Sequence, residues 1–205
     1  MYKKDIKPAL DTTLSLMGLL LFSWLYLLII VAIEIDDPGP VFFKQKRVGI
    51  HKRYFHLYKF RSMKMSTPHD MPTHLLENPE QYITRVGAIL RKYSLDELPQ
   101  LVNILKQDMS IIGPRPALWN QYDLIEERDK YGANDIKPGL SGWAQINGRD
   151  ELSIEEKARL DGEYVEKMSF LFDLKCVAQT ALKVLRHDGV VEGSMGGTHK
   201  VGMEQ

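Results

Sequence analysis

The sequence predicts an α+β protein that is mostly helical. It would combine an N-terminal re-entrant membrane helix, a short β-hairpin and a compact helical domain with amphipathic helices at the membrane interface. Three observations predict this fold. An uncharged apolar run near the N-terminus has the length of a membrane helix, two segments rich in aromatic and β-branched residues follow it, and apolar residues at helical spacing dominate the remainder.

The apolar run predicts a membrane anchor over residues 1–36. Residues 14–33 carry no charge, and 20 residues is about the length that crosses a bilayer core. Thirteen Leu, Ile, Val and Phe residues in this run contribute on the order of −5 kcal/mol toward insertion. A cleaved signal peptide fits less well, because its apolar stretch is usually ~7 to 15 residues long and is followed by a small-x-small site. A buried core helix is the remaining alternative.

Positive charge on both sides of the run indicates a re-entrant topology. Lysines occur within residues 3–7, and five cations follow within residues 44–53, so the positive-inside rule pulls both ends to the cytoplasm. One straight span cannot satisfy both ends. A helix that enters, breaks and leaves by the same face can, provided that the freed backbone groups find partners, for which the Ser23 hydroxyl is a candidate.

A β-hairpin is expected next. Residues 36–40 (DDPGP) end the anchor, since two prolines flanking a glycine cannot continue a helix. Residues 41–48 and 54–63 have strand composition around a turn at 49–52. Period-2 alternation places Lys59 and Arg61 on the same face of the second strand, where they would project side by side. The alternative is a solvated strand edge protected by charge.

The rest of the chain is predicted from helical periodicity and turn residues. The expected elements are a loop at 65–80, short helices at 83–91 and from 98 to 105, a polar helix at about 118–130, a glycine-rich loop at 137–149, helices at 153–167 and 170–186, and a flexible tail at 193–205. The helix at 170–186 is amphipathic, so it would pack on the core or lie along the membrane surface.

Composition excludes several classes of function. Lys+Arg 27 equals Asp+Glu 27, so the overall charge does not indicate a nucleic-acid partner. The single cysteine, Cys176, excludes an internal disulfide framework, and the lack of a Cys/His cluster at ligand spacing argues against a zinc site. We expect Cys176 to be a small buried residue on a C-terminal helix.

Asp96 and Glu97 are the candidate chemical groups. Ser94 and Glu97 also fit a helix capping box, but Pro99 would then lie inside the helix and Asp96 would gain nothing. A carboxylate can ligate Mg²⁺ or attack phosphorus to form an aspartyl phosphate. The cations expected to neutralise a diphosphate are Lys59, Arg61, Arg91, Arg115 and Arg149.

Five motifs, in order along nearly the whole chain, resemble the bacterial sugar transferase family, the small monotopic phosphoglycosyl transferases. They are residues 38–43 (PGPVFF), 58–63 (YKFRSM), 94–100 (SLDELPQ), 113–116 (GPRP) and 139–145 (GLSGWAQ). The resemblance implies that a UDP-sugar donates its sugar-1-phosphate to undecaprenyl phosphate and that UMP is released. Residues 37–192 would form the catalytic domain at the cytoplasmic face of a bacterial plasma membrane.

The resemblance also implies roles for individual residues. Asp96 would be the nucleophile and a ligand of the required Mg²⁺, with Glu97 assisting; Lys59, Arg91 and Arg115 would hold phosphates. Asp161 matches another acidic position of the family and is grouped with the substrate-binding residues, its role left open. One departure concerns the bend, where the family typically has Ser-Pro and this chain has Ser23-Trp24.

Two other function classes remain open from the sequence. A membrane-anchored scaffold would bind a nucleotide sugar without releasing UMP, and a diphosphate hydrolase would use carboxylates and metal but transfer to water. Beyond the UDP-sugar, undecaprenyl phosphate and membrane lipid, a homodimer and downstream glycosyltransferases are further partners left open.

Overall fold

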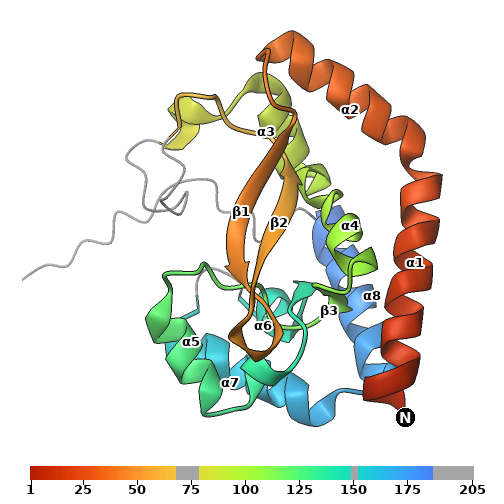
Figure 1. Cartoon of the computed structure of the whole chain (residues 1–205), viewed down its shortest axis with the longest axis vertical. Helices are drawn as coiled ribbons and strands as arrows, with labels where there is room; N and C mark the ends of the chain where they lie inside the picture. Colours follow the sequence, from red (N-terminus) through yellow and green to blue (C-terminus); the bar gives the residue numbers. More distant parts are fainter. Residues whose placement is uncertain (68–78, 149–151, 187–205) are drawn as a thin grey trace, which may run out of the picture.

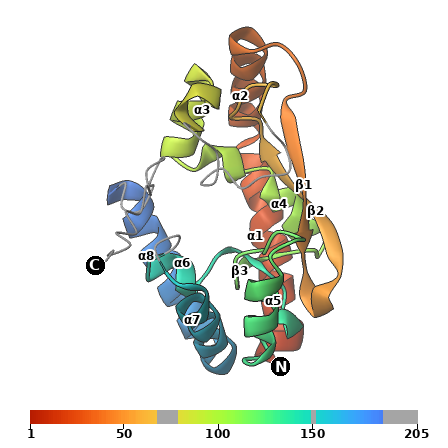
Figure 2. The same cartoon turned by 90° about the vertical axis from the view of Figure 1, so that its left-hand side faces the viewer.

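The computed structural model describes residues 1–67, 79–148 and 152–186. The N-terminal helices run along one side of the molecule (Figure 1), and in the turned view the hairpin and the C-terminal helices lie on opposite faces with the N-terminal helices between them (Figure 2). The expected flexible tail at 193–205, Arg149, and most of the expected loop at 65–80 lie outside the described residues.

The anchor consists of two helices that meet at a sharp bend. A π-helical turn, Tyr2–Ile6, leads into α1 (Lys7–Leu21), and α2 (Ser23–Asp36) follows at an angle of 61°. The Ser23 hydroxyl donates to the Leu20 carbonyl at 2.9 Å, as the sequence suggested for a backbone group freed by the break. The predicted break is therefore present although Trp24 stands where the resemblance implies a proline.

Among the described residues no single helix is long and apolar enough to span a membrane, whereas the bent pair Tyr2–Leu21 and Ser23–Asp36 passes on length and composition alone. Most large apolar side chains of the pair are exposed, including Leu20 at 68% and Trp24 at 60%. Ile29 and Ile33 of α2 are buried in a core cluster with Phe60 and Leu90, and three partly buried residues of the same helix, Leu25, Tyr26 and Ile30, pack against it. One face of the two anchor helices thus packs against the rest of the protein, and the other face exposes apolar side chains.

The predicted hairpin is confirmed. Strand β1 (Phe42–Val48) pairs antiparallel with β2 (Tyr54–Phe60) in a register that sets Phe43 opposite Lys59 and Arg47 opposite Phe55. The turn contains a 3₁₀ segment, Ile50–Lys52. Since cross-strand partners share a face, Arg47 and Lys59 lie on the same side of the hairpin.

Two short α-helices and two 3₁₀ turns lie between the hairpin and the second half of the chain in the described residues. They are η4 (Pro79–Tyr82), α3 (Arg85–Lys92), η5 (Leu95–Glu97) and α4 (Gln100–Leu105). The expected helix at 98–105 begins only after Pro99, which takes the N-cap position and so breaks no helical hydrogen bond.

A small parallel sheet was not predicted. Strand β3 (Ser110–Ile112) pairs with β4 (Gly139–Ser141), inside the segment expected to be a loop. The backbones of these two segments approach each other closely, because a Cβ on Gly139 would lie 2.1 Å from the Gly113 nitrogen. Glycine is needed here for the two chains to touch.

The C-terminal half is helical, as predicted. It contains α5 (Tyr122–Asp129), the turn η6 (Ala133–Asp135), α6 (Trp143–Ile146), α7 (Ile154–Lys167) and α8 (Phe170–Arg186). The polar helix expected from about 118 begins only at Tyr122. On α8 the apolar stripe is exposed, with Leu171 at 74%, while Cys176 is fully buried as expected. The helix does pack on the core, but through Cys176 and Phe172 and not through this stripe, which stays free for the other alternative, contact with a membrane surface.

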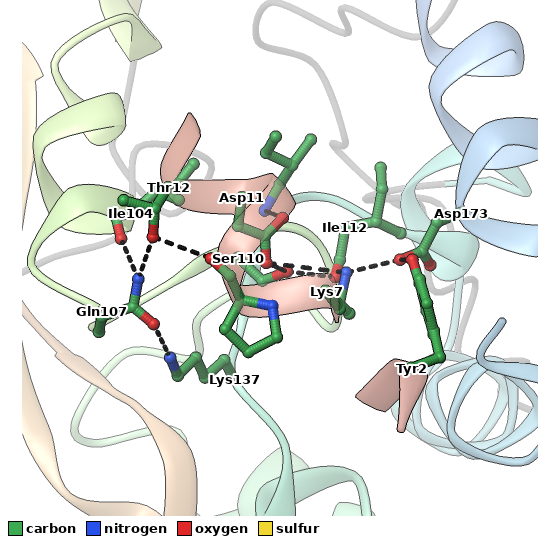
Figure 3. A network of polar contacts seen from close by, with 12 residues as sticks. Tyr2, Lys7, Asp11, Thr12, Ile104, Gln107, Ser110, Ile112, Lys137 and Asp173 are labelled. Atoms are coloured by element: carbon green, nitrogen blue, oxygen red, sulfur yellow. Dashed lines mark hydrogen bonds and ion pairs between the residues drawn. The ribbon is translucent and has the colours of Figure 1, made fainter. Parts of the chain in front are cut away.

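A buried polar network ties α1 to the rest of the fold (Figure 3). The Asp11 carboxylate accepts hydrogen bonds from the Ser110 hydroxyl at 2.6 Å and the Ile111 backbone N–H at 3.1 Å. Lys7 forms an ion pair with Asp173 of α8 at 2.7 Å. The first helix is therefore fastened to β3 and α8 by charge and hydrogen bonds.

Candidate active site

The carboxylate pair lies in a tight turn between α3 and α4. Ser94 adopts a left-handed conformation (φ 55°, ψ 23°), and its side chain makes no capping bond, so the capping-box alternative is wrong at this position. A capping box is present instead at Ser153 and Glu156, at the start of α7. A non-glycine residue with positive φ is uncommon and costs conformational energy. The turn directs both carboxylates toward the hairpin.

Lys59 and Arg115, both predicted cations in the described part of the chain, reach this pair. The Lys59 ammonium lies 2.8 Å from Glu97 Oε1 and 3.7 Å from Asp96 Oδ2. Arg115 Nη2 lies 3.2 Å from the same Glu97 oxygen. Glu97 therefore joins the hairpin cation to the cation of the 113–116 loop, and Asp96 lies beside this ion-pair cluster.

Burial controls the charge state of Asp96. Only 8% of this residue is exposed, and burial raises the pKa of its carboxyl above the ordinary value. The Lys59 charge has the next largest effect and lowers this pKa. The Glu97 charge raises it, and the charges of Arg91 and Arg115 lower it. The cations thus oppose the cost of keeping a buried carboxylate ionised.

Arg61 does not accompany Lys59 into this cluster. β2 ends at Phe60, and the Arg61 side chain, 7% exposed, forms an ion pair with Asp37 at 3.1 Å and also donates to the Asp37 carbonyl. The expectation that the two cations project side by side is wrong, because Arg61 joins the hairpin to the end of the anchor. Arg61 therefore has a structural role at the junction between the anchor and the hairpin.

Asp161 is also held away from the solvent. Its side chain is 1% exposed and accepts from Arg128 at 2.8 Å and 2.6 Å. In this structure the Asp161 carboxylate is occupied by Arg128, and its place among the substrate-binding residues stays a prediction. Arg128 in turn donates to the Arg115 carbonyl at 3.0 Å, so Asp161 reaches the site through two intermediaries.

Sequence reasoning missed Arg47. Its guanidinium donates to the Pro116 carbonyl at 2.9 Å, and burial, with the Arg115 charge adding, lowers its pKa to about 9. It remains protonated at neutral pH. The available signal was the hairpin register, which sets Arg47 on the same face as Lys59. Arg128 gave no comparable signal, because a charged residue on a polar helix is ordinarily exposed.

The donor set fits a magnesium ion that arrives with a diphosphate. No group of three or more His, Cys, Asp or Glu side chains within the described ranges could hold a metal. Mg²⁺ is commonly bound by one or two carboxylates together with substrate phosphates, and Asp96 beside Glu97 offers that number.

A family model described as "Bacterial sugar transferase" matches residues 2–187. The chain belongs to the bacterial sugar transferase family. In this family member Asp96, Glu97, Lys59 and Arg115 lie together in one ion-pair cluster.

Several curated sugar transferases are similar to it. The uncharacterized sugar transferase EpsL of Bacillus subtilis (strain 168) is 42% identical, with 90% of each chain covered. A UDP-glucose:undecaprenyl-phosphate glucose-1-phosphate transferase of Escherichia coli (strain K12) is 40% identical over 87% of this chain and 40% of its own length. A UDP-N-acetylgalactosamine-undecaprenyl-phosphate N-acetylgalactosaminephosphotransferase of Aeromonas hydrophila is 37% identical over 88% of this chain and 44% of its own.

The bacterial sugar transferase described here therefore spans nearly the whole of EpsL and less than half of the two relatives whose names state a substrate. Both of those names combine a UDP-sugar with undecaprenyl phosphate and differ in the sugar.

Proposed function

We propose that this protein is a phosphoglycosyl transferase that moves a sugar-1-phosphate from a UDP-sugar to undecaprenyl phosphate and releases UMP. The observation that carries the proposal is the buried Asp96 carboxylate beside Glu97, with Lys59 and Arg115 drawn onto that pair. The names of the relatives support the substrate classes. The reaction would begin the assembly of a polysaccharide or glycoprotein glycan.

The chemistry proceeds in two displacements at one phosphorus atom. An Asp96 carboxylate oxygen attacks the phosphorus that bears the sugar, the bond from this phosphorus to the bridging oxygen breaks, and UMP leaves with the electron pair. A phosphate oxygen of undecaprenyl phosphate then attacks the same phosphorus and displaces the carboxylate. Splitting the transfer in this way replaces one difficult step by two easier ones.

The cations bind and orient the donor. Arg115 offers a planar fork suited to phosphate oxygens, and Lys59 supplies a compact positive charge on the hairpin side. Arg91 adds positive charge that favours the ionised form of Asp96. Mg²⁺, when bound by Asp96 and the donor, supplies further neutralisation of the diphosphate charge.

The anchor would keep the catalytic part at the cytoplasmic face of the bacterial plasma membrane. The bare apolar faces of α1, α2 and α8 support lipid contact. A UDP-sugar is a cytosolic metabolite and undecaprenyl phosphate is a membrane lipid, so a monotopic enzyme on this face meets both substrates.

The test is release of UMP from a panel of UDP-sugars, measured with undecaprenyl phosphate in nanodiscs. UMP and a lipid-linked phosphosugar should form together with at least one donor. Binding of donor without UMP would indicate the scaffold alternative, and transfer to water without lipid product would indicate the hydrolase. Asp96→Asn should lower turnover by several orders of magnitude, and Glu97→Gln should leave a trace.

A further inference from the structure

The loop that carries Arg115 is held by its carbonyl groups. Four consecutive carbonyls accept hydrogen bonds from three different elements: Pro114 from the Gly139 N–H at 2.8 Å, Arg115 from Arg128 Nη1 at 3.0 Å, Pro116 from Arg47 Nη1 at 2.9 Å, and Ala117 from the Val48 N–H at 3.0 Å. Strand β4, helix α5 and strand β1 thus converge on residues 114–117.

We propose that Arg47 and Arg128 are positioning residues that fix the backbone of Arg115 so that its guanidinium reaches the carboxylate pair. The proposal rests on the proposed function, since it gives Arg115 a phosphate or transition-state charge to meet. Neither arginine is assigned a contact with substrate.

The loop depends on such carbonyl contacts for a chemical reason. Pro114 and Pro116 have no backbone N–H, so every second residue of the loop lacks a donor. Every residue of the loop still has a carbonyl oxygen, so hydrogen bonds to these acceptors can hold the backbone in place. A guanidinium is suited to bind them, because it keeps its charge and directs several donors in one rigid plane.

Arg47 is itself oriented by Gln45 two residues earlier on the same face of β1. Arg47 Nε and Nη2 both donate to Gln45 Oε1, at 3.1 Å and 2.6 Å. The remaining terminal nitrogen, Nη1, is thereby turned to Pro116. With the Ala117 contact made by Val48, the end of β1 continues directly onto the Arg115 loop.

Arg128 is oriented from the opposite direction. Nε and Nη2 are bound by the buried Asp161 of α7, which leaves Nη1 for the Arg115 carbonyl. Figure 1 shows α5 and α7 together at the turn end of the hairpin. Each arginine thus uses two guanidinium nitrogens to bind the side chain that orients it, Gln45 or Asp161, and the third nitrogen to bind the loop. Any effect of these contacts on the carboxylate pair is transmitted through Arg115.

The consequence is that the reaction rate should be sensitive to residues that lie away from the carboxylate pair. Arg115 Nη2 lies 3.2 Å from Glu97 Oε1, and a shift of about 1 Å in a positioned group can cost up to about 100-fold in rate. We expect loss of either anchor to lower kcat/KM for the UDP-sugar by about 10-fold, mainly through kcat.

Two variants test this while keeping the charge at the site. Gln45→Leu removes the oxygen that orients Arg47 and leaves the cation, and Arg128→Lys retains a cation for Asp161 but loses the branch that reaches the loop. Arg53→Gln, on the exposed turn of the same hairpin, is the matched control and should leave kcat/KM unchanged. The two variants act from separate elements, so a folding defect in one leaves the other informative.

Each variant is measured in the native background and in an Arg115→Lys background. The proposal expects the 10-fold loss in the native background and less than a twofold further loss when Arg115 is already replaced, because the anchors act through that residue. Equal losses in both backgrounds would overturn it, since they would indicate a general effect on the fold.

Deuterium exchange of the peptide spanning residues 110–121 provides a readout independent of turnover. Exchange should be faster in Gln45→Leu and Arg128→Lys and unchanged in Arg53→Gln, and unchanged exchange in both anchor variants would overturn the proposal. If the native protein released no UMP from any donor, the proposed function would fail, and exchange alone would decide whether the loop is held as described.

Discussion

Two opposing effects act on the ionisation of the Asp96 carboxyl. Burial raises its pKa, and Lys59 is the largest influence that lowers it. A nucleophilic carboxylate must be ionised, so activity is lost as the pH falls through the pKa of the folded protein. The favourable position of Lys59 therefore widens the pH range in which the site can act.

Replacing Lys59 should move the acid limb of the pH profile. Lys59→Met removes the main influence that lowers the Asp96 pKa, so this pKa rises further and the acid limb of kcat/KM shifts to higher pH. Lys44→Met on the exposed face of the same hairpin is the control and should leave the limb in place. A limb that stays fixed in Lys59→Met would show that another group controls it.

At the level of elements, sequence periodicity predicted the helices and strands whose formation depends on a pattern within one short segment. The hairpin followed from strand composition around a turn, and helices α7 and α8 followed from apolar spacing. The β3–β4 sheet could not be predicted in this way, because its three-residue strands are 27 residues apart and carry too little pattern. The glycines of residues 137–149 predicted a loop there, and nothing in the sequence indicated that this segment pairs with residues 110–112.

The network around Asp11 should stabilise the docking of α1. Asp11→Ala leaves the buried Ile111 N–H without its acceptor, removes the shorter of two hydrogen bonds that the Ser110 hydroxyl makes, and leaves Lys7 with one carboxylate fewer, so it should cost about 3 kcal/mol in the free energy of unfolding. Denaturant unfolding in detergent measures this. Asp5→Ala, whose side chain is 73% exposed, should change stability by less than ~0.5 kcal/mol. Equal effects of the two changes would contradict the role given to the network.

At the scale of the whole molecule, the site residues that lie in short sequence motifs were predictable, whereas the contacts between distant segments of the chain were not. Asp96 and Glu97 are adjacent in the chain, and Lys59 and Arg115 lie in recognisable motifs. Arg47 and Arg128 donate to carbonyls of a distant loop; the hairpin pattern sets Arg47 on the same face as Lys59, but no sequence pattern marks the loop that either arginine contacts. Arg61 and Asp161 resemble site residues in sequence, yet their partners, Asp37 and Arg128, withdraw them from the solvent.

The bent anchor predicts that both of its ends lie on the cytoplasmic side. Single cysteines introduced at position 4 or position 52, in a Cys176→Ser background, should resist an impermeant thiol reagent in intact cells and react once the membrane is opened. Positive charge on both flanks is the physical reason. Labelling of the position 4 site alone in intact cells would indicate a full crossing.

The central claim is that Asp96 carries the phosphosugar, and intact-protein mass spectrometry tests it most directly. Protein incubated with Mg²⁺ and a UDP-sugar that supports transfer, without lipid acceptor, should gain the mass of one sugar phosphate and release one UMP per site, and undecaprenyl phosphate should then discharge the adduct. Asp96→Asn should show no adduct. An adduct of the same mass on Asp96→Asn, or strictly sequential kinetics with no adduct on the native protein, would contradict the account.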